Sequence, residues 1–287
     1  MPSKVKYPCS ILYDGHTSLE GSFLAQPLTE QEAVIMGAVE EFSLSAPLFV
    51  AGEVGSTFDV GWSLASFKNL PPWSAVIART QAGGRGQLRR KWHSPAGNLY
   101  VSFFLPDELA KLGGMASLCL GYLVWAALGD MGIHTLLKWP NDLLLAPKNV
   151  VLSGQEGKLG GILLEEREGR VLAGLGLNLC HAPDTTLLRD GHAVSAVALS
   201  SFAGTVCGFW AELLNGLIYH YTHDIQRTPE KLRQYVEASL AWRGVLVYAE
   251  DSGIAGRITG ITKDGFLLLE TKDGCLQIDS GSIRLVL

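Results

Sequence analysis

Hydrophobic and polar positions form blocks that predict a succession of strands and helices over the first 240 residues. Residues 48–67 are typical of a strand, a turn and a helix. Short apolar segments rich in β-branched and aromatic residues predict further strands. The segment at 134–146 reads as one strand that Pro140 interrupts and that then resumes. The expected strand segments are 74–80, 98–106, 134–146, 158–167 and 170–180, the last two forming a hairpin.

Short sequence patterns also predict the helices. Thr29 and Glu32 form a capping-box pattern, and apolar residues follow at helical spacing (Val34, Ile35, Ala38, Val39, Phe42). Residues 112–129 carry no charge, but they contain four glycines and lie between strands typical of water-soluble folds, so we expect a fully buried core helix rather than a membrane span. Two more helices are expected at 205–222 and 229–240.

From Gly244 onward the pattern changes to short strands separated by DSG and KDG turns, which predicts a small antiparallel barrel or sandwich. We therefore place a domain boundary near residue 240. The predicted fold class is α+β, with a larger mixed-sheet domain at 1–240, whose first 45 residues are irregular except for one helix, and a small β domain at 241–287.

Composition narrows the function classes. The 287-residue chain has a formal net charge of -5, which argues against broad binding of nucleic acid, because such binding needs an extended basic surface. Five scattered cysteines without a CxxC pair favour reduced thiols and a cytoplasmic location. The first fifteen residues lack the apolar core of a signal peptide.

One segment is strongly basic although the chain as a whole is acidic. Residues 83–92, GGRGQLRRKW, combine three glycines with four basic residues directly after an expected strand. Successive glycines allow close approach of the backbone to a ligand, and Arg85 adds a fixed positive charge, so the loop suits a phosphate or a carboxylate. It is neither a P-loop nor a dinucleotide fingerprint, because Arg89 stands at the third glycine position and no helix was expected to follow. A solvated basic turn is the alternative interpretation.

Three other motifs combine polar chemistry with sharp backbone features. In KWPND, at 138–142, Asp142 is suited to hold Mg²⁺ or to orient Lys138, although a rigid turn explains the pattern as well. In GKLGGILLE, at 157–165, Lys158 precedes a glycine pair and is positioned to meet an anion, or is simply a surface lysine. The alternating glycines of GLGLN, at 174–178, leave space for a flat group or permit tight packing.

The order of these motifs along the chain resembles that of the biotin–protein ligase family. GSTFD, the 83–92 loop, KWPND, KLGGILLE and GLGLN carry the resemblance over residues 50–180, and the layout of 244–287 extends it. The resemblance implies a central α/β domain related to lipoate ligases and a C-terminal SH3-like barrel. It also implies activation of biotin by MgATP to biotinyl-5′-adenylate, followed by transfer to a lysine of a biotin carboxyl carrier domain of a biotin-dependent carboxylase.

The same resemblance implies a set of site residues. Catalytic roles fall on Arg85, Lys138 and Lys158, and the metal role on Asp142. The implied biotin-binding residues are Ser56, Thr57, Gln81, Gly84, Arg85, Gly86, Lys158 and Gly161. The implied ATP- and adenylate-binding residues are Gln87, Arg89, Arg90, Trp92, Asn141 and Asn178.

Three positions and one segment depart from the family pattern, and one of the positions is Arg89, which replaces a loop glycine. The second loop arginine is Gln87, and we hypothesise that Arg89 substitutes for its charge. Phe58 stands where the family has an asparagine, and the segment 146–157 is longer than usual. These departures leave open a lipoate- or octanoate-type ligase of the same fold, or a relative that binds biotin or its adenylate without catalysis.

The expected binding partners follow from the same family resemblance. We expect the carrier domain as protein substrate, a possible homodimer through an exposed sheet edge, no membrane, and no DNA, since the residues before GSTFD contain one good helix rather than a winged helix. His220 and His223 are expected to be surface residues rather than metal ligands.

Overall fold

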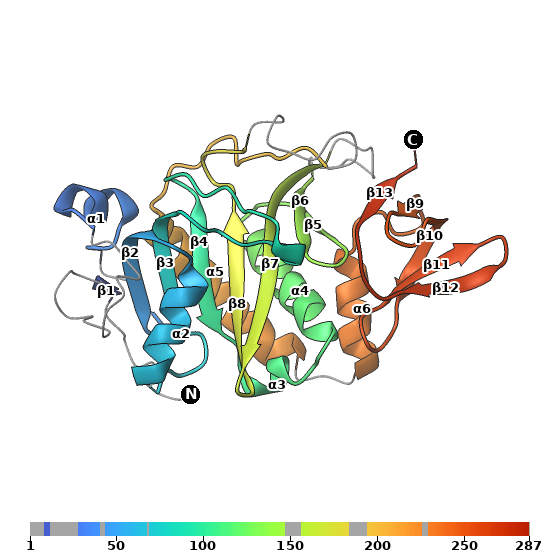
Figure 1. Ribbon diagram of the computed structural model, residues 1–287, viewed down its shortest axis with the longest axis horizontal. Helices are drawn as coiled ribbons and strands as arrows, with labels where there is room; N and C mark the ends of the chain where they lie inside the picture. The colour runs from blue at the N-terminus through green and yellow to red at the C-terminus, as the bar shows by residue number, and fades with distance from the viewer. Residues whose placement is uncertain are drawn as a thin grey trace. The chain divides into compact units, whose positions relative to one another are not determined.

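The structure is a computed structural model that describes residues 9–11, 28–40, 44–67, 69–146, 156–183, 194–225 and 229–286 (Figure 1). Most of the expected insert at 146–157 and most of the irregular extension before residue 28 lie outside the described residues.

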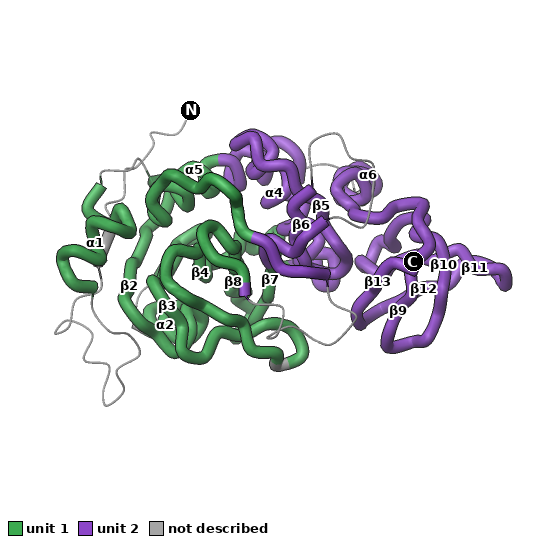
Figure 2. Tube along the Cα trace, turned by 90° about the horizontal axis from the view of Figure 1, so that it is seen from above, with its two compact units in different colours: residues 1–110, 161–182, 198–215 green, residues 111–160, 183–197, 216–287 purple. Residues whose placement is uncertain are grey.

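The chain forms two compact units, each built from separate segments (Figure 2). The first unit comprises residues 1–110, 161–182 and 198–215, and the second comprises 111–160, 183–197 and 216–287. The second unit thus combines the C-terminal strands with residues from the middle of the chain. The boundary near residue 240 stays a prediction about sequence domains.

The first unit is built on a mixed β-sheet. In order across the sheet its strands are β1 (Cys9–Ile11), β2 (Leu48–Val54), β3 (Ala75–Gln81), β4 (Leu99–Phe104), β8 (Arg170–Leu177) and β7 (Gly157–Arg167). The first four residues of β7, 157–160, belong to the second unit. The pairs β1–β2 and β2–β3 are parallel, whereas β3–β4 and β4–β8 are antiparallel. Strand β4 is buried along its whole length, because it lies inside the sheet between β3 and β8.

Helix α2 (Thr57–Phe67) covers one face of this sheet and packs on β3, β4 and β8 (Figure 1). Its first turn follows the GST motif, and the Ser56 hydroxyl accepts a hydrogen bond from the Phe58 amide at 3.4 Å. Phe58, Val60 and Leu64 project from the helix into a core that also contains apolar residues of β2, β3 and β4. The strand–turn–helix prediction for residues 48–67 is confirmed.

Gly174 in β8 faces the buried ring of Phe58, and a Cβ atom added there would lie 2.4 Å from the ring. We expect Gly174→Ala to lower the free energy of unfolding by about 1–3 kcal/mol, because the rigid ring has to move. The matched control is Gly129→Ala in α4 (Met115–Asp130), where the new methyl group meets open space and should add about 0.5–1 kcal/mol through helix propensity. Urea unfolding of both variants tests this difference, and equal effects would contradict the packing explanation.

Helix α1 (Glu30–Met36) begins with the predicted capping box. The Thr29 hydroxyl accepts from the Glu32 amide, and the Glu32 carboxylate accepts from the Thr29 amide. The Thr29 amide and then the Thr29 hydroxyl, by donating to the Glu32 carboxylate, hold the pKa of that carboxyl below its usual value. The helix is shorter than the apolar spacing indicates, because Gly37 adopts a left-handed conformation with φ of 73°.

The second unit contains the KWPND segment as a hairpin. Strands β5 (Thr135–Lys138) and β6 (Asp142–Leu145) pair antiparallel, and the peptide bond between Trp139 and Pro140 is cis. The interrupted strand is therefore confirmed, with the interruption forming the turn. The Trp139 side chain is buried, and its indole nitrogen donates to the carbonyl of Gly265 at 3.0 Å.

Helix α4 packs on this hairpin, on β5 most closely, and is buried on nearly all sides, which confirms the predicted core helix at 112–129. Among the described residues, none of the helices combines the length and the hydropathy that crossing a membrane requires. Gly121 permits close contact with the strands, since a Cβ atom there would lie 2.6 Å from the Leu137 side chain.

The C-terminal strands form a five-stranded antiparallel sheet, as the turn spacing predicts. The order is β12 (Gly274–Ile278), β11 (Leu267–Thr271), β10 (Ile254–Ile261), β9 (Leu246–Ala249) and β13 (Ile283–Leu285). Glycines with positive φ lie at the predicted DSG and KDG turns, at 253, 265, 274 and 281. The predicted fold class, a mixed α+β arrangement with a C-terminal β domain, is confirmed.

The remaining helices are α3 (Asp107–Ala110), α5 (Val206–His220), which continues as a π-helix over Tyr221–Ile225, and α6 (Pro229–Ser239). His220 is not the surface residue that the sequence suggested. Its Nδ1 lies 2.8 Å from Asp224 and its Nε2 lies 2.9 Å from Asp130, so the ring is held between two carboxylates. His223 is exposed, as expected, and stacks on Tyr219.

Candidate functional site

The residues expected to carry the chemistry fall into one cluster in each unit. In the first unit they surround the loop at 83–92, and in the second they surround KWPND and Lys158. Each cluster is built by hydrogen bonds and ion pairs within its own unit.

The loop at 83–92 closes on itself rather than standing open. Its centre is a short 3₁₀ turn, η1 (Gln87–Arg89), in which Leu88 has a φ of 55° and points its apolar side chain into solvent. The Gly86 amide donates to the carbonyl of Arg90 at 2.8 Å, and Arg85 forms a β-bridge with Lys91. The helical turn was not expected from the sequence, and within it the Arg90 amide donates to the carbonyl of Gln87 at 3.1 Å.

The glycines of the loop serve internal packing in this structure. The Gly83 amide donates to the carbonyl of Gly55 at 2.8 Å. A Cβ atom at Gly84 would lie 2.5 Å from the carbonyl oxygen of Trp92 and 2.7 Å from the Ser94 hydroxyl. Close approach of the backbone was predicted, and here the approaching groups belong to the chain itself.

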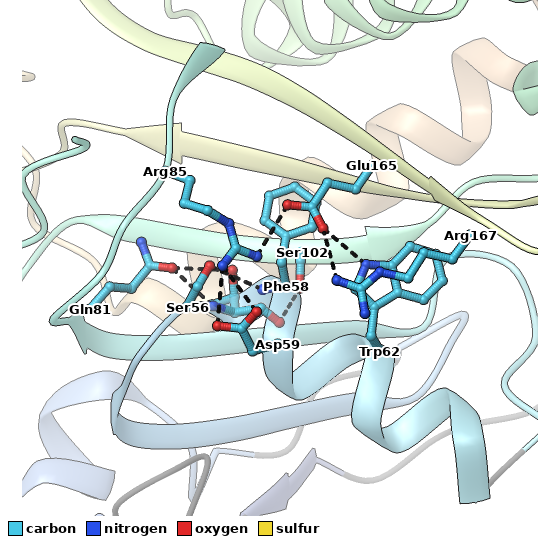
Figure 3. Close-up of polar contacts among 10 residues, drawn as sticks. Ser56, Phe58, Asp59, Trp62, Gln81, Arg85, Ser102, Glu165 and Arg167 are labelled. Atoms are coloured by element: carbon cyan, nitrogen blue, oxygen red, sulfur yellow. Dashed lines mark hydrogen bonds and ion pairs between the residues drawn. The ribbon is translucent and has the colours of Figure 1, made fainter. Parts of the chain in front are cut away.

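Gln81, at the end of β3, joins the loop to the start of helix α2. Its side-chain oxygen accepts from the Thr57 amide at 2.9 Å, and its amide nitrogen donates to the Ser94 hydroxyl at 3.0 Å. The Ser94 hydroxyl in turn donates to the carbonyl of Trp92 at 3.2 Å. These bonds join Thr57 and Gln81, two of the residues that the resemblance implies for biotin binding. A third, Ser56, directly precedes Thr57 and is drawn with Gln81 in Figure 3.

Arg85 lies between two carboxylates (Figure 3). Its Nη1 is 3.0 Å from Oδ1 and 3.2 Å from Oδ2 of Asp59, and its Nη2 is 3.1 Å from Oε1 of Glu165. The guanidinium carbon lies 5.5 Å from the centre of the Phe58 ring, within the range of a cation–π contact. Within the described residues, the buried Nε of Arg85 has no hydrogen-bond partner.

No local pattern in the sequence marks this acidic pair. Glu165, on β7, also accepts from the Trp62 indole at 3.1 Å and lies 3.5 Å from Arg167. Arg167 in turn lies over the Trp62 ring, 5.0 Å from its centre. Asp59 is the last residue of the GSTFD motif, in which the resemblance implied roles only for Ser56 and Thr57.

The alternating glycines of β8 permit tight packing of aromatic rings. Phe58 lies against Gly174, and the Trp92 indole lies 2.8 Å from a Cβ atom added at Gly176. The tight-packing interpretation of GLGLN is therefore the one this structure shows. It also explains Phe58, whose ring occupies the apolar core of the first unit rather than an open polar position.

The second cluster centres on Asp142. Its Oδ1 lies 2.5 Å from Nζ of Lys158, and its Oδ2 lies 3.2 Å from Nζ of Lys138. The side chains are 16% exposed for Asp142, 9% for Lys138 and 30% for Lys158. Burial alone would raise the pKa of the Asp142 carboxyl, but the charges and hydrogen bonds of the two lysines outweigh it and hold that pKa below its usual value.

Hairpin geometry explains this cluster. Lys138 ends β5, Asp142 begins β6, and the two are paired in the antiparallel register. Lys158 is the second residue of β7, and its amide and carbonyl are bonded to Ser195 and Val197. Two positive charges and one negative charge leave a net positive charge of one, which is suited to an anionic phosphate or carboxylate.

The other implied residues are placed less directly. Asn141 is buried in the turn of the hairpin, and Asn178 is buried after β8, where its carbonyl accepts from the Leu199 amide at 3.2 Å. Gly161 lies in β7, where the strand passes into the first unit. Arg90 is exposed, and the side chain of Arg89 lies outside the described residues.

Comparison with known proteins agrees with this arrangement. Residues 53–179 match the biotin/lipoate A/B protein ligase family, and residues 245–286 match the biotin protein ligase C-terminal domain. The chain is 31% identical over 247 residues to the bifunctional ligase/repressor BirA of Bacillus subtilis, covering 81% of this chain and 72% of that protein. The chain belongs to the biotin protein ligase family. It is also 35% identical over 126 residues to a biotin–[acetyl-CoA-carboxylase] ligase of Paracoccus denitrificans, covering 40% of this chain and 48% of that protein.

Solved structures of this family support the same conclusion. The biotin protein ligase of Aquifex aeolicus in complex with biotin and ATP superimposes with a TM-score of 0.65 at 26% identity, covering 83% of this chain and 99% of that one. The resemblance stated from the motifs, and the biotin–ligase type of fold, are thereby confirmed.

Proposed function

We propose that this protein is an ATP-dependent ligase that activates biotin as biotinyl-5′-AMP and transfers the biotinyl group to a lysine of a carrier protein. Membership of the biotin protein ligase family supports the reaction type, and the observation that carries it in the structure is the partly buried Lys138–Asp142–Lys158 cluster. The carboxyl-terminal family match favours biotin over lipoate as the acid that is activated.

The chemistry needs positioned cations rather than an enzyme nucleophile. In the first step the biotin carboxylate attacks the α-phosphorus of ATP, the bond to the pyrophosphate oxygen breaks, and pyrophosphate leaves. Negative charge accumulates on the phosphoryl oxygens during this displacement, and fixed ammonium or guanidinium groups lower its energy. Lys138 and Lys158 in the second unit, and Arg85 in the first, are the residues we assign to this role.

In the second step a carrier lysine attacks the activated carbonyl, the bond to AMP breaks, and the product is an amide. Lys158 is assigned to stabilise the negative charge on the carbonyl oxygen. We assign Ser56, Thr57, Gln81, Gly84, Gly86 and Gly161 to biotin, and Gln87, Arg89, Arg90, Trp92, Asn141 and Asn178 to the nucleotide.

The donor set limits what a metal ion does here. Among the described residues there is no group of three or more His, Cys, Asp or Glu side chains arranged for a metal ion. Asp142 offers one carboxylate, which is too few for a resident cation but sufficient for Mg²⁺ that arrives with ATP phosphates. We therefore propose that Mg²⁺ enters as the MgATP complex and that Asp142 is its protein ligand.

The acceptor we propose is the biotin carboxyl carrier domain of a biotin-dependent carboxylase, because relatives such as the Paracoccus denitrificans protein are named for that substrate. A cytoplasmic location, a homodimer through a sheet edge, and the absence of DNA binding stay predictions of the sequence.

The test is release of pyrophosphate by the purified protein with biotin and MgATP, with and without a biotin carboxyl carrier domain. We expect release that depends on biotin and rises with the carrier, together with biotin on one carrier lysine. Lipoate and octanoate serve as the competing acids. Activity with those acids but not with biotin, or biotin binding without pyrophosphate release, would contradict the proposal.

A further inference from the structure

The ion pairs around Arg85 are chemically unequal, and this inequality carries an inference that rests on the proposed function. Glu165 is held by three side chains, since its Oε1 binds Arg85 and its Oε2 binds both Trp62 and Arg167. Asp59 is more exposed, at 36% compared with 24% for Glu165, and within the described part of the chain Arg85 is its only ion-pair partner. One carboxylate is fixed by its surroundings, and the other is fixed by Arg85 alone.

The geometry at the guanidinium also favours exchange. An arginine binds an anion best when two nitrogens face two oxygens of the same group. Here Asp59 contacts only Nη1, with both of its oxygens, and Glu165 contacts Nη2. Neither carboxylate uses the two-nitrogen fork, so an incoming carboxylate or phosphate group can offer Arg85 a better contact than Asp59 does.

The charges of the network support the same interpretation. Arg85 and Arg167 balance Asp59 and Glu165, so that the four side chains together are neutral. An anionic ligand therefore gains little from Arg85 unless one of its carboxylates moves away. The one with fewer contacts and greater exposure is Asp59, at the first turn of helix α2.

We propose that Glu165 and Asp59 are positioning residues with different tasks. Glu165 anchors Arg85, and with it the loop at 83–92, before any ligand arrives. Asp59 occupies the side of the guanidinium that the anionic group of biotin or of its adenylate takes over, and it is released when that group binds. Glu165 thus keeps the loop ordered in the free protein, and Asp59 sets the affinity for the anionic ligand.

The experiment compares Asp59→Asn and Glu165→Gln with the wild type and with Glu166→Gln. The last variant removes the same charge at the exposed neighbouring position and is the matched control. Isothermal titration with biotin is expected to show binding about two- to fivefold tighter for Asp59→Asn, the size expected when one partly exposed ion pair stops competing. Glu165→Gln is expected to bind at least about fivefold more weakly, and Glu166→Gln to match the wild type.

Steady-state kinetics separates positioning from simple loss of structure. For Asp59→Asn we expect a lower KM for biotin at an unchanged kcat, which is the signature of altered uniform binding. Weaker binding in Asp59→Asn, or wild-type binding in Glu165→Gln, would overturn the division of tasks.

Hydrogen exchange in the absence of ligand gives a readout that does not depend on the proposed function. We expect faster exchange of the amides at 83–92 in Glu165→Gln, and wild-type exchange in Asp59→Asn and Glu166→Gln. If the wild type neither binds biotin nor releases pyrophosphate, the proposed function is wrong. Independently of that result, unchanged amide exchange at 83–92 in Glu165→Gln would show that Glu165 does not anchor the loop.

Discussion

Replacing Lys158 by methionine is expected to lower the rate of biotin- and ATP-dependent pyrophosphate release by about 10²–10³-fold, the size found when one preorganised charge-stabilising donor is removed. Methionine keeps the length and the apolar stem of the side chain but removes the ammonium group. Lys158 is held 2.5 Å from Asp142 and is 30% exposed, so its charge is both fixed in place and accessible. The loss should appear mainly in kcat, because the charge that Lys158 stabilises develops in the transition state.

The matched control is Lys272→Met, at an exposed turn between β11 and β12. It removes the same charge and should leave the rate unchanged. Thermal unfolding shows whether Lys158→Met is folded, and a biotin-binding measurement shows whether it still binds its substrate. A folded Lys158→Met enzyme with a rate within about threefold of the wild type would exclude Lys158 from the chemical step.

Much of the fold could be predicted from local signals. The capping box of Thr29 and Glu32, the uncharged helix at 112–129, the strands around Pro140 and the glycine turns after Gly244 each follow from short-range chemistry, and each is present in the structure. The pairing of strands across the sheet could not be derived in this way, because the partners in β4 and β8 lie 68 (Phe104 and Leu172) to 78 (Leu99 and Leu177) residues apart in the sequence.

In the candidate site, too, contacts between residues close in sequence could be predicted and contacts between distant residues could not. Lys138 and Asp142 lie on neighbouring strands of a tight hairpin, so their pairing follows from the sequence around Pro140. The pairing of Arg85 with Glu165 joins a loop to a strand eighty residues away, and no local pattern marks it. Phe58 looked like a departure that could affect the ligand, and only the packing of its ring on Gly174 shows that it belongs to the core.

Asp142 provides the second large effect, on stability. We expect Asp142→Asn to lower the free energy of unfolding by about 3 kcal/mol at neutral pH, because removing one partner of a largely buried ion pair leaves charge without compensation. Here two ammonium groups, Lys138 and Lys158, lose the Asp142 carboxylate that pairs with both of them. Asparagine preserves the shape and one acceptor oxygen, so the loss measures charge rather than packing.

The pH dependence distinguishes this explanation from a general defect. The pKa of Asp142 is lower in the folded protein than its ordinary value, so its contribution is complete above the unfolded pKa, near 4, and declines as the pH falls through the folded pKa. The stability gap between wild type and Asp142→Asn should therefore be constant from about pH 5 to 8 and should narrow below about pH 4. Urea unfolding across this range measures the gap, with Asp273→Asn at the exposed β11–β12 turn as the control. A gap that persists unchanged in acid would show that the asparagine disturbs packing and that the ion pairs are not its cause.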